Sequence, residues 1–254
     1  MVNLFCGDCN NIMGGVLNAE SVDLILTSPP YNMTKRKGGY ADKCKRYDEY
    51  NDWKPEEEYL SWMVTTFNNF DRVLKQNGVV LFNFSYSIEN PSMPYKLVAN
   101  IIANTRFNLV DTLIWKKKSG IPFPANKYRL SRIWEFVFVF VKKGNENDFN
   151  IYKNVKSVSE KTGQTYYEVI YNFFEAKNND GACELNKATF STQMVERLLN
   201  IYACEDTLVL DPFMGTGTTG VACCKNNIDF IGIEISKKQF EYAKNRMNLN
   251  QEEQ

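Results

Sequence analysis

The chain has 254 residues, 44% of them hydrophobic, and its 30 basic and 30 acidic side chains give a formal net charge of zero. This length suffices for one α/β core with an insertion, and the zero net charge counts against a compact nucleic-acid-binding module. The absence of histidine excludes an imidazole base and the usual zinc sites, and the longest nearly apolar run, residues 133–141, is too short to span a bilayer.

The first informative segment follows an apolar run at 22–26, which predicts a buried strand. Thr27-Ser28-Pro29-Pro30-Tyr31-Asn32 ends that strand with polar and aromatic groups that a packed core does not favour. The prolines lack backbone donors and fix φ, so their carbonyls stay free to accept hydrogen bonds beside the ring of Tyr31. Such acceptors next to an aromatic face suit the exocyclic amino group of a nucleobase. An ordinary proline-rich turn is the alternative.

The next stretch alternates helices and strands. Pro55 and the three glutamates after it open a helix whose apolar stripe ends near Gly78. The pattern further predicts a strand at 78–84, a helix at 95–103, and paired strands at 109–115 and 133–141.

Two groups of basic residues flank the proposed pocket in sequence. The first directly follows the proline-containing segment and comprises Lys35, Arg36 and Lys37, with Lys43, Lys45 and Arg46 nearby. The second lies in an acid-free stretch with interleaved aromatic residues and comprises Lys116, Lys117, Lys118, Lys127, Arg129 and Arg132. A charge run is often a solvated loop, which is the alternative here. We predict that both groups contact nucleic-acid phosphates.

Residues 144–185 interrupt the alternating pattern. The stretch is polar and rich in asparagine and lysine, with a modest apolar patch at 166–174. It is short for a domain that folds alone, so we expect an extension of the main fold. A surface insertion without a binding role is the alternative.

The second landmark lies near the C-terminus, where a predicted strand at 207–210 runs into Asp211-Pro212-Phe213-Met214-Gly215-Thr216-Gly217-Thr218-Thr219-Gly220. The glycines at 215 and 217 permit a tight turn and close approach of a ligand, and the helix N-terminus that follows favours polar groups. A further strand at 230–233 ends in Glu234, which is placed to bind ribose hydroxyls. This pattern predicts a nucleoside-containing cofactor.

Other interpretations of this glycine turn have less support. The Gly-x-Gly-x-x-Gly spacing alone is a weak sign of dinucleotide binding, and no Gly-Lys-Ser/Thr closes a phosphate-binding loop. The interpretation as a structural turn that binds no ligand stays open, although Glu234 at the end of the next strand argues against it. A nicotinamide enzyme normally carries its fingerprint at the start of the domain, whereas few residues follow it here. A parallel sheet needs more strands than these few residues can form, so the other strands must come from the sequence before the glycine turn. The order of the strands is therefore permuted.

The seven cysteines give no strong signal of their own. Cys6 and Cys9 have metal or redox spacing but no second pair, so we expect no metal site. Scattered cysteines without a secretion signal indicate a reducing, cytoplasmic compartment.

The two landmarks, in this order, resemble those of the beta-type amino-group DNA methyltransferases, in which the catalytic tetrapeptide precedes the S-adenosylmethionine motif. The match runs from Gly7-Asp8-Cys9 to Gly232-Ile233-Glu234-Ile235, and residues 186–193 resemble the remaining cofactor segment. The resemblance implies an α/β, Rossmann-like methyltransferase fold with a doubly wound, mostly parallel sheet and a circularly permuted motif order. It divides the chain into a catalytic part at 1–143, a target-recognition insertion at 144–185 and a cofactor-binding part at 186–254.

The resemblance also implies roles for individual residues. Ser28, Pro29, Pro30 and Tyr31 would form the catalytic segment and hold the target base. Asp8 would accept from the cofactor's adenine amino group, Phe213 and the glycine turn would hold its methionine part, Glu234 would bind its ribose, and Phe190 would pack against it. The complete cofactor-binding set comprises Asp8, Ser28, Phe190, Thr192, Asp211, Phe213, Gly215, Gly217, Thr218, Glu234 and Ile235. Family members often carry histidine where Asn186 stands, which is a departure in this chain.

Position 28 bears on the base that is methylated. By resemblance, serine there is more frequent in enzymes that methylate N4 of cytosine, whereas aspartate marks those that methylate N6 of adenine. Carbon methylation would need a cysteine after a proline, and none is present. Direct transfer to an amino nitrogen needs only alignment and a free lone pair. We therefore expect N4 of a flipped-out cytosine as the acceptor, with N6 of adenine as the alternative.

The resemblance implies double-stranded DNA as a partner and leaves a cognate restriction endonuclease and a homodimer open. An NAD-dependent oxidoreductase would use the glycine turn and Glu234 but would not explain Ser28 to Tyr31. A non-catalytic DNA-binding relic would keep the basic residues and have a damaged cofactor turn, whereas this turn is intact.

Overall fold

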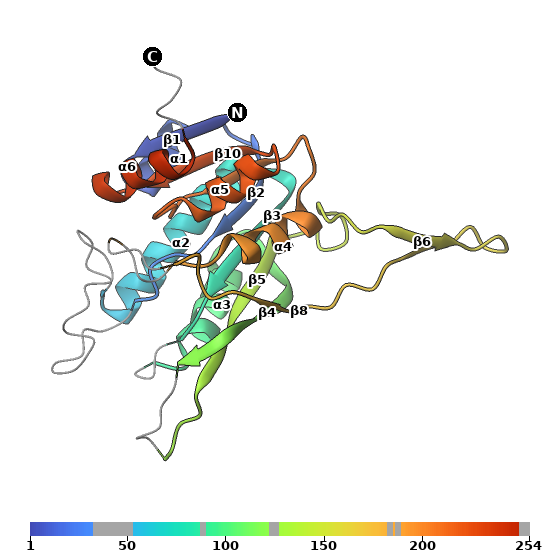
Figure 1. Ribbon diagram of the computed structural model, residues 1–254, viewed down its shortest axis with the longest axis horizontal. Helices are drawn as coiled ribbons and strands as arrows, with labels where there is room; N and C mark the ends of the chain where they lie inside the picture. The colour runs from blue at the N-terminus through green and yellow to red at the C-terminus, as the bar shows by residue number, and fades with distance from the viewer. Residues whose placement is uncertain (33–52, 87–89, 122–126, 182–184, 186–188, 249–254) are drawn as a thin grey trace.

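The computed structural model describes residues 1–32, 53–86, 90–121, 127–181, 185 and 189–248. Among these residues the main feature is an eight-stranded sheet, which Figure 1 shows with its flanking helices. In spatial order its strands are β1 (Val2–Cys6), β10 (Asp229–Glu234), β9 (Leu208–Asp211), β2 (Val22–Thr27), β3 (Leu74–Phe84), β5 (Arg132–Lys142), β4 (Phe107–Ile121) and β8 (Phe173–Ala176).

The sheet is mostly parallel, because within the described residues only β5 runs against its neighbours, β3 and β4. Strand β1 pairs in parallel with β10, and Val2 lies opposite Phe230. The C-terminal strands β9 and β10 thus lie between β1 and β2, which are consecutive in sequence. The predicted doubly wound, mostly parallel sheet with a permuted order is confirmed.

Both faces of the sheet are buried, because successive side chains of a strand point to opposite faces. Along β3, Val80 and Phe82 belong to one hydrophobic core, whereas Val79 and Leu81 belong to the other. Residues of α1 (Cys9–Gly15), α2 (Glu56–Val73) and α3 (Met93–Asn104) complete the first core, and residues of α4 (Thr192–Tyr202), α5 (Thr218–Lys225) and α6 (Lys237–Arg246) complete the second. No helix of the described chain is long and apolar enough to cross a bilayer.

Helix α2 begins where the sequence predicts, with Pro55 at its N-cap and three glutamates in its first turn. It ends earlier than predicted, at Val73, and β3 follows directly from Leu74. Gly78 lies inside β3, where a Cβ atom would stand 2.6 Å from the Leu74 side chain and 3.0 Å from the carbonyl oxygen of Asp23. This glycine therefore permits close packing within the sheet and does not end the helix.

The predicted strands at 109–115 and 133–141 form the antiparallel pair β4 and β5, in which Thr112 lies opposite Phe138. Strand β4 is longer than predicted and continues to Ile121. The lysines at 116–118 consequently lie on a strand and not in a loop.

The segment 144–185 contains a small two-stranded sheet and one strand of the central sheet. Strands β6 (Val155–Val158) and β7 (Thr165–Tyr167) pair with each other and project away from the main body of the molecule (Figure 1). Strand β8 pairs in parallel with β4, and Phe173 lies opposite Ile114. The segment is thus an extension joined to the central sheet. Its role in target recognition stays a prediction.

Candidate active site

A pocket opens where four parallel strands bring their carboxyl ends to one edge of the sheet. Strand β1 leads into Gly7, β2 into Ser28 and β9 into Pro212, and β10 ends at Glu234. The pocket is lined by Gly7, Asp8, Cys9, Ser28, Pro29, Pro30, Tyr31, Trp62, Thr189, Phe190, Pro212, Phe213, Met214, Gly215, Thr216, Thr218, Glu234, Ile235 and Gln239. The proline-containing segment and the glycine turn therefore share one cavity.

All four residues of the predicted catalytic segment, Ser28 to Tyr31, line this pocket. The carbonyl oxygen of Pro30 accepts a 2.7 Å hydrogen bond from the hydroxyl of Tyr59 on α2. The carbonyl oxygen of Pro29 receives no hydrogen bond from any described residue. The segment is therefore anchored at Pro30 and keeps the Pro29 oxygen as an acceptor for a ligand.

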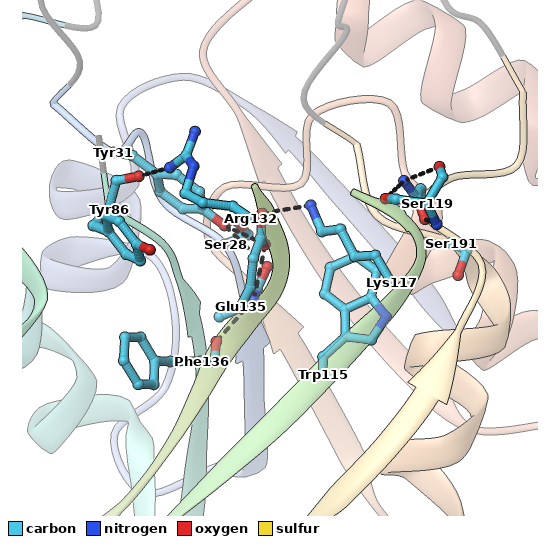
Figure 2. Close-up of polar contacts among 12 residues, drawn as sticks. Ser28, Tyr31, Tyr86, Trp115, Lys117, Ser119, Arg132, Glu135, Phe136 and Ser191 are labelled. Atoms are coloured by element: carbon cyan, nitrogen blue, oxygen red, sulfur yellow. Dashed lines mark hydrogen bonds and ion pairs between the residues drawn. The ribbon is translucent and has the colours of Figure 1, made fainter. Parts of the chain in front are cut away.

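Tyr31 belongs to a hydrogen-bond network that crosses three strands. Its hydroxyl oxygen lies 2.9 Å from Ser28 Oγ, 3.0 Å from Asn83 Oδ1 on β3 and 3.3 Å from Glu135 Oε2 on β5. Lys117 on β4 reaches the other oxygen of Glu135 at 2.5 Å, as Figure 2 shows. A cation, a carboxylate and two hydroxyls are thus linked behind the pocket wall.

Asp211 supports the glycine turn from below and is fully buried. Its carboxylate accepts hydrogen bonds from the hydroxyls of Thr27 (2.7 Å) and Thr219 (2.6 Å) and from the backbone N–H of Phe213 (3.1 Å). The bond from Thr27 joins the turn directly to the strand that carries Ser28. Asp211 was predicted to bind the cofactor, and the structure places it beneath the pocket wall and not on it.

Burial raises the pKa of Asp211 to about 6, although its three hydrogen bonds act in the opposite direction. Because an unfolded aspartate titrates near pH 4, the folded state binds this proton more tightly. The stabilisation is present below pH ~4 and is lost as the pH rises through about 6. Asp211→Asn removes this titration, so we expect the unfolding free energy of the variant, relative to that of the wild type, to increase by about 2 kcal/mol between pH 4.5 and pH 7.5. Urea unfolding at both pH values measures the difference, and parallel pH dependences would contradict the prediction.

Glu234 lies at the end of β10, buried against the glycine turn. One carboxylate oxygen accepts a 2.8 Å hydrogen bond from the backbone N–H of Gly215, and the other accepts a 2.8 Å bond from the N–H of Ser236. These two bonds fix the orientation of the carboxylate, which lies on the pocket wall.

Gly217 is the N-cap of α5 and has φ +80°, in the left-handed region. A Cβ atom there would lie 2.8 Å from Cβ of Ala243 on α6. We expect Gly217→Ala to lower the unfolding free energy by about 2–4 kcal/mol, from backbone strain plus steric overlap. Gly163→Ala is the matched control, because Gly163 has φ +71° with open space around it, and it should cost only about 1–2 kcal/mol. Equal losses in urea unfolding would contradict the steric part of the prediction.

Other predicted cofactor contacts divide between the pocket wall and its surroundings. Asp8 caps α1 by accepting from the N–H of Asn11 at 2.9 Å and also lines the pocket. Phe190, Phe213, Gly215, Thr218 and Ile235 line it as well, whereas Thr192 and Gly217 do not. The backbone N–H of Thr192 is 3.0 Å from the carboxylate of Asp180. Residues 186–188 lie outside the described residues.

Several residues of the pocket wall were not predicted. Trp62 on α2 packs edge-on against Phe213 with 5.7 Å between ring centroids. Trp62 directly precedes Met63, a residue of the predicted apolar stripe of α2. This position is the sequence signal that could have placed Trp62 close to the sheet. Gln239 on α6 and Cys9 on α1 carried no such signal. Burial raises the pKa of the Cys9 thiol to about 12, so Cys9 is an unreactive thiol at neutral pH.

The predicted phosphate-contacting residues differ in their surroundings. Lys35, Arg36 and Lys37 lie outside the described residues. Lys116 pairs with Glu175 at 2.5 Å, Lys117 pairs with Glu135, and Arg132 donates to the backbone oxygen of Tyr86 and stacks on its ring. Lys118, Lys127 and Arg129 are exposed. Within the described residues, no group of three or more cysteine, aspartate or glutamate side chains is placed to hold a metal ion.

Comparison with known proteins assigns the family. The model of the N6_N4_Mtase family, described as DNA methylase, matches residues 22–245. The chain belongs to this family of DNA methylases. The type II methyltransferase M.BglII of Bacillus subtilis is 26% identical to this methylase over 94% of the chain and 67% of its own length. The orphan methyltransferase M.BamHII of Bacillus amyloliquefaciens is 27% identical over 89% of both chains.

Solved structures of DNA methyltransferases share the fold of the methylase. The cytosine-N4-specific PvuII DNA methyltransferase superposes with a TM-score of 0.72 at 19% identity, covering 96% of this chain and 86% of its own. The complex of M1.HpyAVI with SAM gives a TM-score of 0.62 at 23% identity, covering 98% and 100%. Fold and family therefore agree with the motif order read from the sequence.

Proposed function

We propose that this methylase transfers a methyl group from S-adenosylmethionine to the N4 amino group of a cytosine that is rotated out of double-stranded DNA. The observation that carries the proposal is the shared pocket: oxygen acceptors at Ser28 and Pro29 face the same cavity as Glu234 and Asp8. The first pair suits an amino group, and the second suits a nucleoside. The PvuII enzyme, which is cytosine-N4-specific, has the same fold, which supports the base assignment.

The cofactor would be held by the carboxyl ends of β1, β9 and β10. Glu234 would accept from the ribose hydroxyls, Asp8 from the adenine amino group, and Phe190 and Phe213 would pack against the ligand. When bound, S-adenosylmethionine supplies an electrophilic methyl group on sulfur. The protein's part is to align the amino nitrogen with that group and to keep its lone pair free, and the nitrogen loses one proton after transfer.

DNA binding is proposed for two parts of the surface. Lys118 lies on β4, and Lys127 and Arg129 lie between β4 and β5; all three are exposed and would contact phosphates. The projecting β6–β7 segment would contribute to target recognition. A cognate restriction endonuclease and a homodimer stay predictions.

The test is to incubate the methylase with double-stranded DNA and methyl-labelled S-adenosylmethionine, digest the DNA to nucleosides and identify the product by mass spectrometry. The expected product is N4-methylcytosine. N6-methyladenine would contradict the base assignment, and no labelled nucleoside would contradict the proposed activity. Long-read sequencing of the same DNA would identify the recognition site.

A further inference from the structure

The hydrogen bonds behind Tyr31 have a defined direction, which begins at Asn83. The amide nitrogen of Asn83 donates a 2.9 Å hydrogen bond to the backbone carbonyl of Phe136, and a carbonyl can only accept. This bond fixes the orientation of the amide, so its oxygen must face Tyr31. Asn83 is 2% exposed, and its oxygen is therefore a fixed acceptor within the network.

The second acceptor facing Tyr31 is the carboxylate of Glu135. An ionised carboxylate has no proton to donate. Lys117 holds it at 2.5 Å, and the two side chains are only 19% and 14% exposed. The ammonium group of Lys117 also lies 4.8 Å from the centre of the Trp115 ring. Glu135 is consequently a charged acceptor in a partly desolvated setting, where hydrogen bonds are strengthened.

Tyr31 has one hydroxyl proton, and two of the groups that face it, Asn83 Oδ1 and Glu135 Oε2, can only accept a proton. That proton is therefore used toward Asn83 Oδ1 or Glu135 Oε2, which lie 3.0 Å and 3.3 Å away. The contact with Ser28 Oγ at 2.9 Å must then use the proton of Ser28. Ser28 donates to Tyr31 and points its lone pairs elsewhere.

The direction of the Ser28 hydrogen bond matters for an amino group that is to receive a methyl group. A hydroxyl that accepts from the NH2 group increases electron density on the nitrogen, whereas one that donates to the nitrogen would occupy the lone pair that must attack the methyl carbon. Ser28 lines the pocket, where the base would bind.

We propose that Glu135, held by Lys117, is a positioning residue that acts through the Tyr31 hydroxyl and makes Ser28 a hydrogen-bond acceptor toward the amino group of the base. Asn83 supports the same direction. Ser28, Tyr31, Glu135 and Lys117 are linked in this order by the contacts given above, and Figure 2 shows the four side chains together. The inference rests on the proposed function and extends it to residues outside the pocket wall.

A double-mutant cycle tests this inference, because an effect that passes through one hydroxyl disappears when that hydroxyl is removed. We expect Glu135→Gln to lower kcat for methyl transfer by about 10- to 100-fold, since a hydrogen bond to a charged group is lost. In a Tyr31→Phe background, Glu135→Gln should lower kcat by less than about 2-fold further. The affinity for S-adenosylmethionine should be the same in all four proteins.

The matched control is Asp23→Asn. Asp23 is also a carboxylate whose side chain is 14% exposed, and it pairs with Lys75 at 2.8 Å. It lies near the start of β2, whereas the pocket lies at the carboxyl end of that strand. We expect Asp23→Asn to change stability but to leave kcat unaltered in both backgrounds.

Lys117→Met gives a second, independent cycle and is used if Glu135→Gln does not fold. A positioning role predicts a loss of kcat that vanishes in the Tyr31→Phe background. A phosphate contact predicts instead a weaker affinity for DNA and a shallower salt dependence in both backgrounds, which would contradict the positioning role of Lys117.

The outcomes separate the inference from the proposed function. Losses that multiply in the Glu135→Gln and Tyr31→Phe double variant would overturn the inference, because they would show that Glu135 acts independently of the Tyr31 hydroxyl. A wild-type protein that transfers no methyl group to DNA would contradict the proposed function instead. An active wild type with non-additive losses supports both.

Discussion

Replacing Tyr31 with alanine is expected to lower kcat for methyl transfer by at least about 100-fold, while the dissociation constant for S-adenosylmethionine changes by less than about 3-fold. Under the proposed function, Tyr31 would offer a ring face to the base and receive the hydrogen bond of Ser28, whose Oγ lies 2.9 Å from its hydroxyl. The proposed cofactor contacts, Glu234 and Asp8, come from other strands. Single-turnover kinetics and calorimetric titration with the cofactor measure the two quantities separately.

Tyr31→Phe is the matched variant, because it keeps the ring and its packing at 4.8 Å from Phe84 while removing the hydroxyl. We expect the kcat of Tyr31→Phe to be lower than that of the wild type and higher than that of Tyr31→Ala. Thermal unfolding of each variant shows whether the fold is retained. A large loss of cofactor affinity in Tyr31→Ala would contradict the proposal that the proline-containing segment binds the base and the glycine turn binds the cofactor.

Replacing Glu234 with glutamine should have the opposite result: the affinity for S-adenosylmethionine falls by about 10- to 100-fold, and kcat at saturating cofactor is less affected. The amide cannot accept at both of its ends, so one of the bonds from Gly215 and Ser236 is lost together with the charge. Charge-assisted hydrogen bonds to the ribose would weaken at the same time. Calorimetric titration with the cofactor measures the affinity directly.

Glu241→Gln serves as the control for this charge change. Glu241 lies exposed on α6, so the variant has the same net charge as Glu234→Gln without touching the pocket. Its cofactor affinity should equal that of the wild type. The cofactor assignment is wrong if Glu234→Gln binds S-adenosylmethionine with wild-type affinity and if, in thermal-shift titration, the wild-type protein binds NADH more tightly than S-adenosylmethionine.

Much of the site was predictable, because its residues follow strands that the sequence identifies. Ser28 follows one apolar run, and Asp211 and Glu234 end two others. Since parallel strands present their carboxyl ends at one edge, these segments had to meet there. The position of each side chain within the site depends on packing as well. Asp211 lies beneath the wall because its bonds to Thr27 and Thr219 fix the turn, and this depends on how β9 packs beside β2.

The sequence by itself determined the strand ends, the glycine turn and the permuted order, because hydrophobic runs and glycine positions are local features that each limit the backbone nearby. Only the tertiary structure decided that Glu135 and Lys117 lie behind Tyr31. Glu135 is 104 positions from Tyr31 in the chain, and its approach depends on the register in which β4 and β5 pair and on β5 lying beside β3. Register is set by packing across the whole sheet, so no local pattern in the sequence could have revealed this contact.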